Sequence, residues 1–225
     1  MTYPLLRLIH LLGLTLMGAG LIGVWYADLR SRQIRQLPVF AETVHSIRVF
    51  YDGLVVPGAL LLLGSGIWLI VTVYGGWAFL GMPWLAGMVV LFAFEFIEGN
   101  TITRLYFLRL DRLTREALAL GVVTSELAAA RRRHVPTLTH FLDLPILFVI
   151  VALGAMRPNT WTLFVVGTVV AVAFAIALAL AIPRMYPFGL DRAGDLLTGL
   201  PPRRGEREEH AGSCPPRVET ARMRG

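Results

Sequence analysis

The sequence predicts an all-α protein, a polytopic helical membrane bundle with five transmembrane helices. Hydrophobic residues make up 56% of the 225-residue chain, and the mean hydropathy is +0.64, which is unusual for a soluble domain. Five apolar runs each approach the ~20 residues that a helix needs to cross a bilayer. The runs do not alternate between apolar and polar residues, so they are helices rather than strands of a membrane barrel.

The five runs differ in how regular they are. The first is too long for the apolar part of a secretory signal and has no basic segment before it, so we interpret it as a permanent helix. The fourth is the least regular, because Asp143 and Pro145 interrupt it. The predicted spans are residues 4–26, 53–74, 80–97, 139–156 and 161–182.

Arginine accounts for all 21 basic residues, and its distribution predicts the orientation of the spans. Nineteen arginines fall in residues 27–52, 99–138 and 183–225, which leaves Arg7 and Arg157 for the other side. Because cytoplasmic segments carry the excess of basic residues, we expect the amino terminus outside and the carboxyl terminus inside. The net charge of +6 then reflects topology, so the expected partner is the lipid bilayer and not nucleic acid. A basic complement without lysine is typical of a GC-rich genome, and we expect a multi-pass protein of a bacterial inner membrane.

The two long connections predict helical extensions into the cytoplasm. The first span continues as ADLRSRQIRQ and the third as TITRLYFLRLDRLTREALAL. Between the first two spans, Phe40, Val44 and Ile47 share one helix face, a pattern that favours a helix lying in the membrane interface. We assign residues 1–200 to the transmembrane domain. Residues 201–225 have too few apolar residues to fold and are predicted to be a disordered, basic cytoplasmic tail.

Four ionisable residues lie near the cytoplasmic ends of the third and fourth predicted spans. Glu95 and Glu98 are three residues apart, and His140 and Asp143 have the same spacing, so each pair lies on one side of its helix. An acid facing lipid costs about 2.5–3.5 kcal/mol at the centre of a helix, so we predict that both glutamates face the bundle. At least one of them should contact His140, Asp143, Arg48 or Arg104.

The first interpretation of these residues is structural. Acids at membrane depth pair with basic groups, and Arg48 and Arg104 lie close by in the predicted topology. Asp52, at the start of the second span, is a further candidate for such an ion-pair network. A network of this kind would fix the register of the helices and nothing more.

Two functional interpretations stand beside it. Glu95, Glu98, His140 and Asp143 could together bind a divalent metal ion, since carboxylate and imidazole ligands suit manganese, iron or zinc. Alternatively, the acids form a protonatable cluster at the mouth of a pathway for an ion or a small solute. The sequence leaves these interpretations open.

His10 is the one histidine in the outer half of the predicted spans. It lies about 9 Å along its helix from Pro4, among leucines. It could bind a haem iron, or it could form a hydrogen bond with a neighbouring helix. His10 and His140 cannot share one haem, because they lie near opposite faces of a core about 30 Å thick.

No sequence motif indicates an enzyme. The chain has no phosphate-binding glycine loop, no nucleophile elbow and no H-E-x-x-H motif, and its single cysteine is Cys214. We therefore expect a non-catalytic protein whose acids serve assembly or the movement of an ion or solute, with a haem- or metal-dependent redox protein as the alternative. Small residues at a spacing of four in the fifth span predict close helix packing, either within the chain or with a second copy. These residues are Gly167, Ala171, Ala175 and Ala179.

Three motifs carry a resemblance to a known family. LLRLIHLLG, FEFIEGNTITRLYF and HFLDLPILFVIVALGAMRP together resemble the bacterial predicted integral-membrane family called domain of unknown function 2269. The likeness covers about residues 3–158 and implies a four-helix membrane unit without an assigned activity, to which the fifth span and the tail are additions. A fainter similarity, to four-helix membrane haem proteins of the copper-resistance and protoporphyrinogen-oxidising kind, implies a haem-ligand role for His10 alone.

Overall fold

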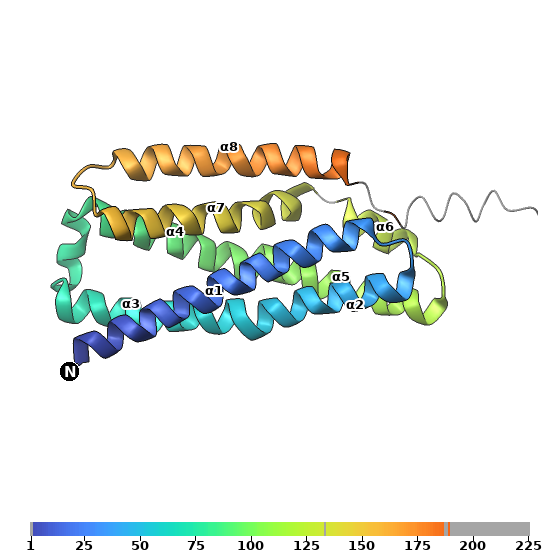
Figure 1. The fold of residues 1–225 in the computed structure, drawn as a ribbon, viewed down its shortest axis with the longest axis horizontal. Coiled ribbons are helices and arrows are strands. Elements are labelled where there is room, and N and C mark those ends of the chain that lie inside the picture. The colour runs from blue at the N-terminus through green and yellow to red at the C-terminus, as the bar shows by residue number, and fades with distance from the viewer. Residues whose placement is uncertain (1, 133, 187–188, 190–225) are drawn as a thin grey trace, which may run out of the picture.

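The computed structural model describes residues 2–132, 134–186 and 189, and these residues form a bundle of long helices with no strand among them (Figure 1). This confirms the all-α prediction, and five helical runs in the described residues are long and apolar enough to cross a membrane. The α-helices are α1 (Thr2–Gln33), α2 (Leu37–Phe50), α3 (Val56–Val73), α4 (Pro83–Glu98), α5 (Arg104–Leu120), α6 (Ser125–Arg131), α7 (His134–Met156) and α8 (Thr162–Met185).

Two of the runs are single rods built from an α-helix, a short π-helix and a second α-helix. The segment η1 (Tyr51–Val55) joins α2 to α3, and η3 (Gly99–Thr103) joins α4 to α5. A rod of about 37 residues is roughly 55 Å long, which exceeds the ~30 Å hydrocarbon core of a bilayer. The excess length forms the predicted helical extensions.

The segment around Phe40 differs from its prediction. This segment forms α2, which lies in line with α3, and it is not a separate helix lying in the membrane interface (Figure 1). Its apolar residues Phe40, Val44 and Ile47 are fully buried, because α1 and α5 pack against this face. The apolar helix face that the pattern predicts is present, but other helices of the protein cover it instead of lipid.

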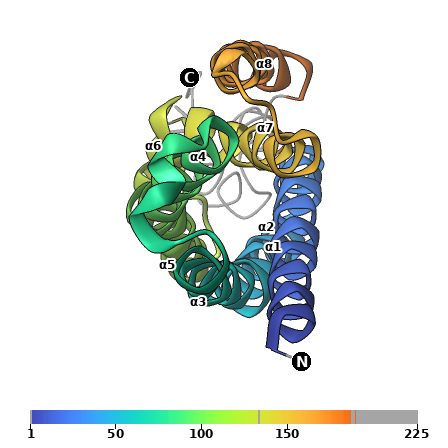
Figure 2. The same cartoon turned by 90° about the vertical axis from the view of Figure 1, so that its left-hand side faces the viewer.

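Viewed along the bundle, α1, α3, α4 and α7 are arranged in a ring, and α8 lies outside them against α7 (Figure 2). Glycines allow α1 and α3 to approach closely. A Cβ atom on Gly58 would lie 2.5 Å from the backbone nitrogen of Met17, and one on Gly13 would lie 3.0 Å from the carbonyl oxygen of Gly58. Small residues therefore set the close packing of α1 against α3.

The helices α7 and α8 also pack through small residues. Pro145 does not end α7, which runs unbroken from His134 to Met156, so the fourth span is more regular than predicted. Ala171 and Ala175 are buried, and the side chain of Val149 fills the space beside Gly167. The predicted ladder of small residues is thus covered by α7 of the same chain.

The connections are sorted between the two ends of the bundle. The turn between α1 and α2, together with α5 and α6, lies at one end, which we call the arginine-rich end (Figure 1). The amino terminus, the 3₁₀ segment η2 (Gly76–Gly81) and the α7–α8 connection lie at the other, which we call the chamber end. The predicted disordered tail, with Cys214, lies outside the described residues.

Candidate functional site

Three acidic side chains come together inside the bundle, and we call them the carboxyl cluster: Glu95 and Glu98 from α4, and Asp143 from α7. They are 4%, 6% and 2% exposed, which confirms that both glutamates face the bundle. Glu95 lies about 18 Å along α4 from its first residue, a depth that falls within a core of about 30 Å. Acids at such a depth are rare unless they have a function or a partner.

Hydrogen bonding within the carboxyl cluster is incomplete. The hydroxyl of Thr103 donates to Oε1 of Glu98 at 2.7 Å, and Asp143 lies within hydrogen-bonding reach of the Glu98 carboxyl group. Two carboxylates offer only acceptors, so a bond between them requires a proton on one. Without that proton, neither oxygen of Asp143 has a donor among the described residues, and Oε1 of Glu95 has none there either.

Tyr51 forms part of the wall of the carboxyl cluster. Its hydroxyl donates to the carbonyl oxygen of Gly99 at 2.8 Å, and its ring lies within electrostatic range of all three acids. A Cβ atom on Gly99 would lie 2.8 Å from this hydroxyl, so glycine is required for the close approach. Tyr51 and Gly99 begin the two π-helical segments η1 and η3, and such segments are frequent at functional sites.

A small cavity of about 20 Å³ lies between α1, α3, α4 and α7 and is bordered by Tyr51, Glu95 and Asp143. This volume is enough for about one water molecule, and the polar groups at its edge could bind that water. The cavity beside the carboxyl cluster therefore has room for a water molecule but not for a larger solute.

The arginines near the carboxyl cluster bind other acids. Arg104 pairs with Asp52 at 2.9 Å, and Arg48 pairs with Asp52 at 3.5 Å and with Asp111 at 3.2 Å. Arg48 and Arg104, two of the predicted ion-pair candidates, thus both lie within ion-pairing distance of the third, Asp52. Neither arginine pairs with the glutamates or Asp143 among the described residues, since Asp52 and Asp111 bind them instead. The contact predicted for at least one glutamate is that of Glu98 with Asp143.

His140 lies in aromatic surroundings. Its ring is 2% exposed and packs against Phe107 at 5.3 Å and Phe141 at 5.1 Å between ring centroids, with Trp25 at 6.3 Å. Neither ring nitrogen has a hydrogen-bond partner among the residues that the structure describes. Within the described part of the chain, no three His, Cys, Asp or Glu side chains are arranged to hold a metal ion. The geometry thus gives no support to a metal site made of the carboxyl cluster and His140.

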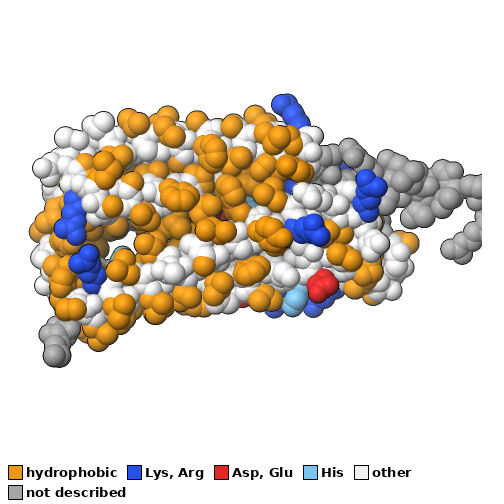
Figure 3. Space-filling view, viewed as in Figure 1, with side chains coloured by type: hydrophobic (Ala, Val, Ile, Leu, Met, Phe, Trp, Pro, Cys, Tyr) orange, Lys and Arg blue, Asp and Glu red, His pale blue; other side chains and the backbone are white. Residues whose placement is uncertain are grey.

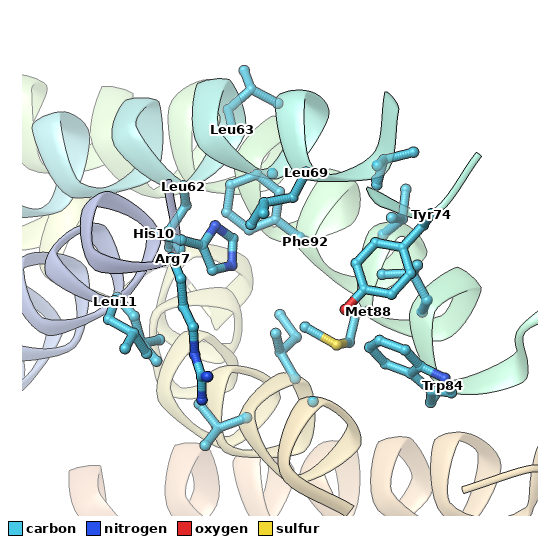
Figure 4. Close-up of a pocket in the computed structure, with 18 of the residues that line it drawn as sticks. Arg7, His10, Leu11, Leu62, Leu63, Leu69, Tyr74, Trp84, Met88 and Phe92 are labelled. Carbon is cyan, nitrogen blue, oxygen red and sulfur yellow. The ribbon is translucent and has the colours of Figure 1, made fainter. Parts of the chain in front are cut away.

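His10 forms the hydrogen bond to a neighbouring helix that was one of its two interpretations. Its Nδ1 lies 2.9 Å from the hydroxyl oxygen of Ser65 on α3. The Ser65 hydroxyl donates to the carbonyl oxygen of Leu61, so it accepts from His10 and places the imidazole proton on Nδ1. The lone pair of Nε2 is then left for another group, and the ring projects into an open space near Phe92 and Met88 (Figure 4).

This space is a chamber of about 420 Å³ between α1, α3, α4 and α7. Its walls are mainly apolar, and two arginines, Arg7 and Arg157, line it. Basic side chains lie beside a hollow at the chamber end of the molecule (Figure 3). In the sequence, Arg7 and Arg157 are the two arginines outside the arginine-rich segments. That isolated position is the sequence signal that could have identified them as candidate site residues.

The fold and these buried ionisable groups define a polytopic helical membrane protein. The chain belongs to the family described as "Predicted integral membrane protein (DUF2269)", which matches residues 4–158. The match ends before α8, in agreement with the view that the fifth span is an addition to a four-helix unit. No curated protein and no solved structure matches the chain, so the fainter likeness to membrane haem proteins has no support from these comparisons.

Proposed function

We propose that this is a non-catalytic, multi-pass protein of the bacterial inner membrane in which the carboxyl cluster takes up and releases a proton during the movement of an ion or small solute. One observation carries the proposal. Glu95, Glu98 and Asp143 are buried together at membrane depth, while the nearby arginines are engaged by Asp52 and Asp111. Ionisable groups in that position are the usual components of proton relays.

Electrostatics favours proton uptake at this position. Two like charges 4 Å apart repel by about 4 kcal/mol at an effective dielectric constant of 20, and more where water is scarce. A proton shared between Glu98 and Asp143 removes one such repulsion and supplies a donor to the Asp143 carboxyl group, which has no other donor among the described residues. Because Glu95 keeps an oxygen without a partner beside a cavity of water size, a second position for the proton is close by.

A short chain of hydroxyl groups leads away from the carboxyl cluster. Glu98 accepts from Thr103, and the Thr103 hydroxyl lies 3.1 Å from that of Thr139. Thr103 is fully buried, whereas Thr139 is only partly buried. Hydroxyl groups both donate and accept, so this chain is a plausible route for protons between Glu98 and the surface.

Infrared difference spectroscopy of the reconstituted protein tests the proposal without knowledge of the solute. Raising the pH should remove a carbonyl band of a protonated carboxyl group, and that band should shift in heavy water. It should be absent in Glu98→Gln or Asp143→Asn and unchanged in Glu116→Gln, a control whose side chain is 56% exposed on α5. A spectrum with no such band, or the same band in all variants, would overturn the proposal.

Orientation enters the proposal because it decides the side from which protons reach Glu98. We propose the amino terminus outside, on the basis of the arginine distribution. Reporter fusions at Gly76 and Glu126 test this directly. An external Glu126 would reverse the orientation and place Thr139 on the outer side.

A haem-dependent redox protein is the second candidate, and the hydrogen bond of His10 favours it. Metal-binding histidines typically donate one ring N–H to a fixed acceptor, as His10 does to Ser65, and bind through the other nitrogen. His10 would hold the iron, and Arg7 and Arg157 would face the propionate groups. A bound haem would supply one-electron transfer.

A visible spectrum of the purified protein separates the two candidates. A Soret band that disappears in His10→Ala would favour the haem protein. A stable, colourless and iron-free protein would remove this candidate and leave the proton-handling proposal in place.

A further inference from the structure

We infer that the chamber binds an amphipathic anion, with its long apolar body between α1, α3, α4 and α7 and its carboxylate or phosphate group held by Arg7 and Arg157. This site lies at the opposite end of the spans from the polar layer of Asp52 and Asp111, and it has no part in the proton chemistry proposed above. Two independent features lead to it: the charge of this half of the molecule and the shape and lining of the chamber.

The half of the bundle around the chamber has basic groups and no acid. Residues 1–27, 53–94 and 144–190, which supply its helices and connections, contain no Asp or Glu. Among the described residues, neither Arg7 nor Arg157 takes part in an ion pair. Two guanidinium groups without a counter-ion repel a cation and attract a carboxylate or phosphate, to which arginine can donate two parallel hydrogen bonds.

The two arginines come from distant parts of the chain and are directed to the same chamber. Arg7 lies on the second turn of α1, and Arg157 follows the last residue of α7. The guanidinium group of Arg157 lies over the ring of Trp84, 5.4 Å from its centroid, which holds the side chain at the chamber wall. Its backbone has φ of 46°, in the left-handed region where glycine or asparagine is more usual. These contacts keep a positive charge at the rim.

The chamber fits the apolar part of such a ligand. Its volume of about 420 Å³ lies within the ~300–1,000 Å³ that is usual for small-molecule sites. Leu62, Met88 and Phe92 contribute to the apolar walls, and His10 adds one hydrogen-bond acceptor near the middle (Figure 4). A neutral hydrocarbon would leave the arginines without a partner, and a small inorganic anion would leave the apolar walls uncovered. An amphipathic anion satisfies both.

Binding of defined probes to the full-length protein in an uncharged detergent tests the inference. Dodecanoate and dodecyl phosphate should bind and raise the unfolding temperature, whereas dodecanol, with the same chain and no charge, should bind at least tenfold more weakly. Arg7→Gln and Arg157→Gln should each weaken binding of the anions by about tenfold, since each removes a charge-assisted hydrogen bond. The matched control is Arg112→Gln, on α5 at the arginine-rich end, where the side chain is 68% exposed. It should leave binding unchanged.

Native mass spectrometry distinguishes the sources of the anion. A phospholipid that co-purifies at one per chain and is lost in the Arg7→Gln/Arg157→Gln double variant would identify the surrounding membrane as the source. Loss of a free fatty acid in the same variant would identify a soluble or diffusing ligand, and either result supports the site. The inference would be overturned if dodecanol bound as tightly as the anions, or if neither arginine substitution weakened the binding of the anions. A haem whose Soret band depends on His10 would also overturn the assignment, in favour of the second candidate function.

Discussion

The bundle contains two groups of acids with opposite surroundings. Asp52 and Asp111, which we call the paired aspartates, are bound by Arg48 and by further arginines at 2.9–3.5 Å. The carboxyl cluster lies deeper, on α4 and α7, and its Glu98 accepts a hydrogen bond from the neutral hydroxyl of Thr103 at 2.7 Å. Both groups consist of carboxyl groups, and one rod contributes to both. Its α4 part supplies Glu95 and Glu98, and its α5 part supplies Asp111.

The difference shows which acids serve stability. The arginines that bind the paired aspartates are 37–62% exposed, so water solvates part of their charge and little of the attraction is lost to desolvation. Among the described residues, no salt bridge joins an arginine to the carboxyl cluster, where burial is a net cost to the fold. A costly group that persists at membrane depth is best explained by function. Four changes would break or sharpen this contrast.

The largest effect is expected from Asp111→Asn. The Asp111 carboxylate is 2% exposed and binds Arg115 at 3.0 Å and Arg48 at 3.2 Å. Loss of these charge-assisted bonds should lower the free energy of unfolding by about 2 kcal/mol. Unfolding of the protein in mild detergent micelles measures the change. The control is Glu116→Gln, which removes an exposed pair with Arg112 and should cost less than about 0.5 kcal/mol. Equal effects of the two substitutions would contradict the structural role of Asp111.

A smaller effect is expected from Gly99→Ala, which changes the wall of the carboxyl cluster without changing its charge. The new Cβ atom would lie 2.8 Å from the Tyr51 hydroxyl, so the two π-helical segments must move apart. Overpacking of this kind costs about 1–2 kcal/mol. Gly53→Ala, in the other π-helical segment, meets nothing within 4 Å and provides the matched control. If both substitutions change the free energy of unfolding by the same amount, the close approach of Tyr51 to Gly99 does not contribute to stability.

Double-mutant cycles compare the two groups of acids directly. Combining Arg48→Gln with Asp111→Asn should reveal a coupling free energy of about 1 kcal/mol, because the two side chains are in contact. The combination of Arg104→Gln with Glu95→Gln should be additive within about 0.3 kcal/mol, since Arg104 binds Asp52 instead. A coupling of similar size in both cycles would show that arginine does stabilise the carboxyl cluster.

The smallest effect on stability is expected from Glu95→Gln. Replacing a buried acid that lacks a basic partner by an amide of the same shape should change the free energy of unfolding by no more than about 0.5 kcal/mol, or stabilise the protein. The same variant should keep the infrared band of the protonated carboxyl group, because Glu98 and Asp143 still share the proton. Loss of stability comparable to that of Asp111→Asn would mean that Glu95 is structural and would remove the contrast.

Much of the fold follows from local sequence, because the cost of exposing polar groups to lipid acts on each segment separately. Apolar length alone located five spans, and the arginine distribution correctly grouped the two long connections at one end. The same cost required Glu95 and Glu98 to face protein, which the structure confirms. These conclusions need no knowledge of which helices are neighbours.

The tertiary structure, in contrast, decides which acid each arginine binds. Sequence placed Arg48, Arg104 and the acids in one layer, but a helix shift of one turn, about 5.4 Å, determines which acid each arginine meets. The rods put Asp52 and Asp111 within reach of the arginines and left Asp143 against Glu98. The chamber is likewise a product of four helices that are not consecutive in the chain. Local sequence sets what each side chain can tolerate, and only the packing of distant helices sets what it touches.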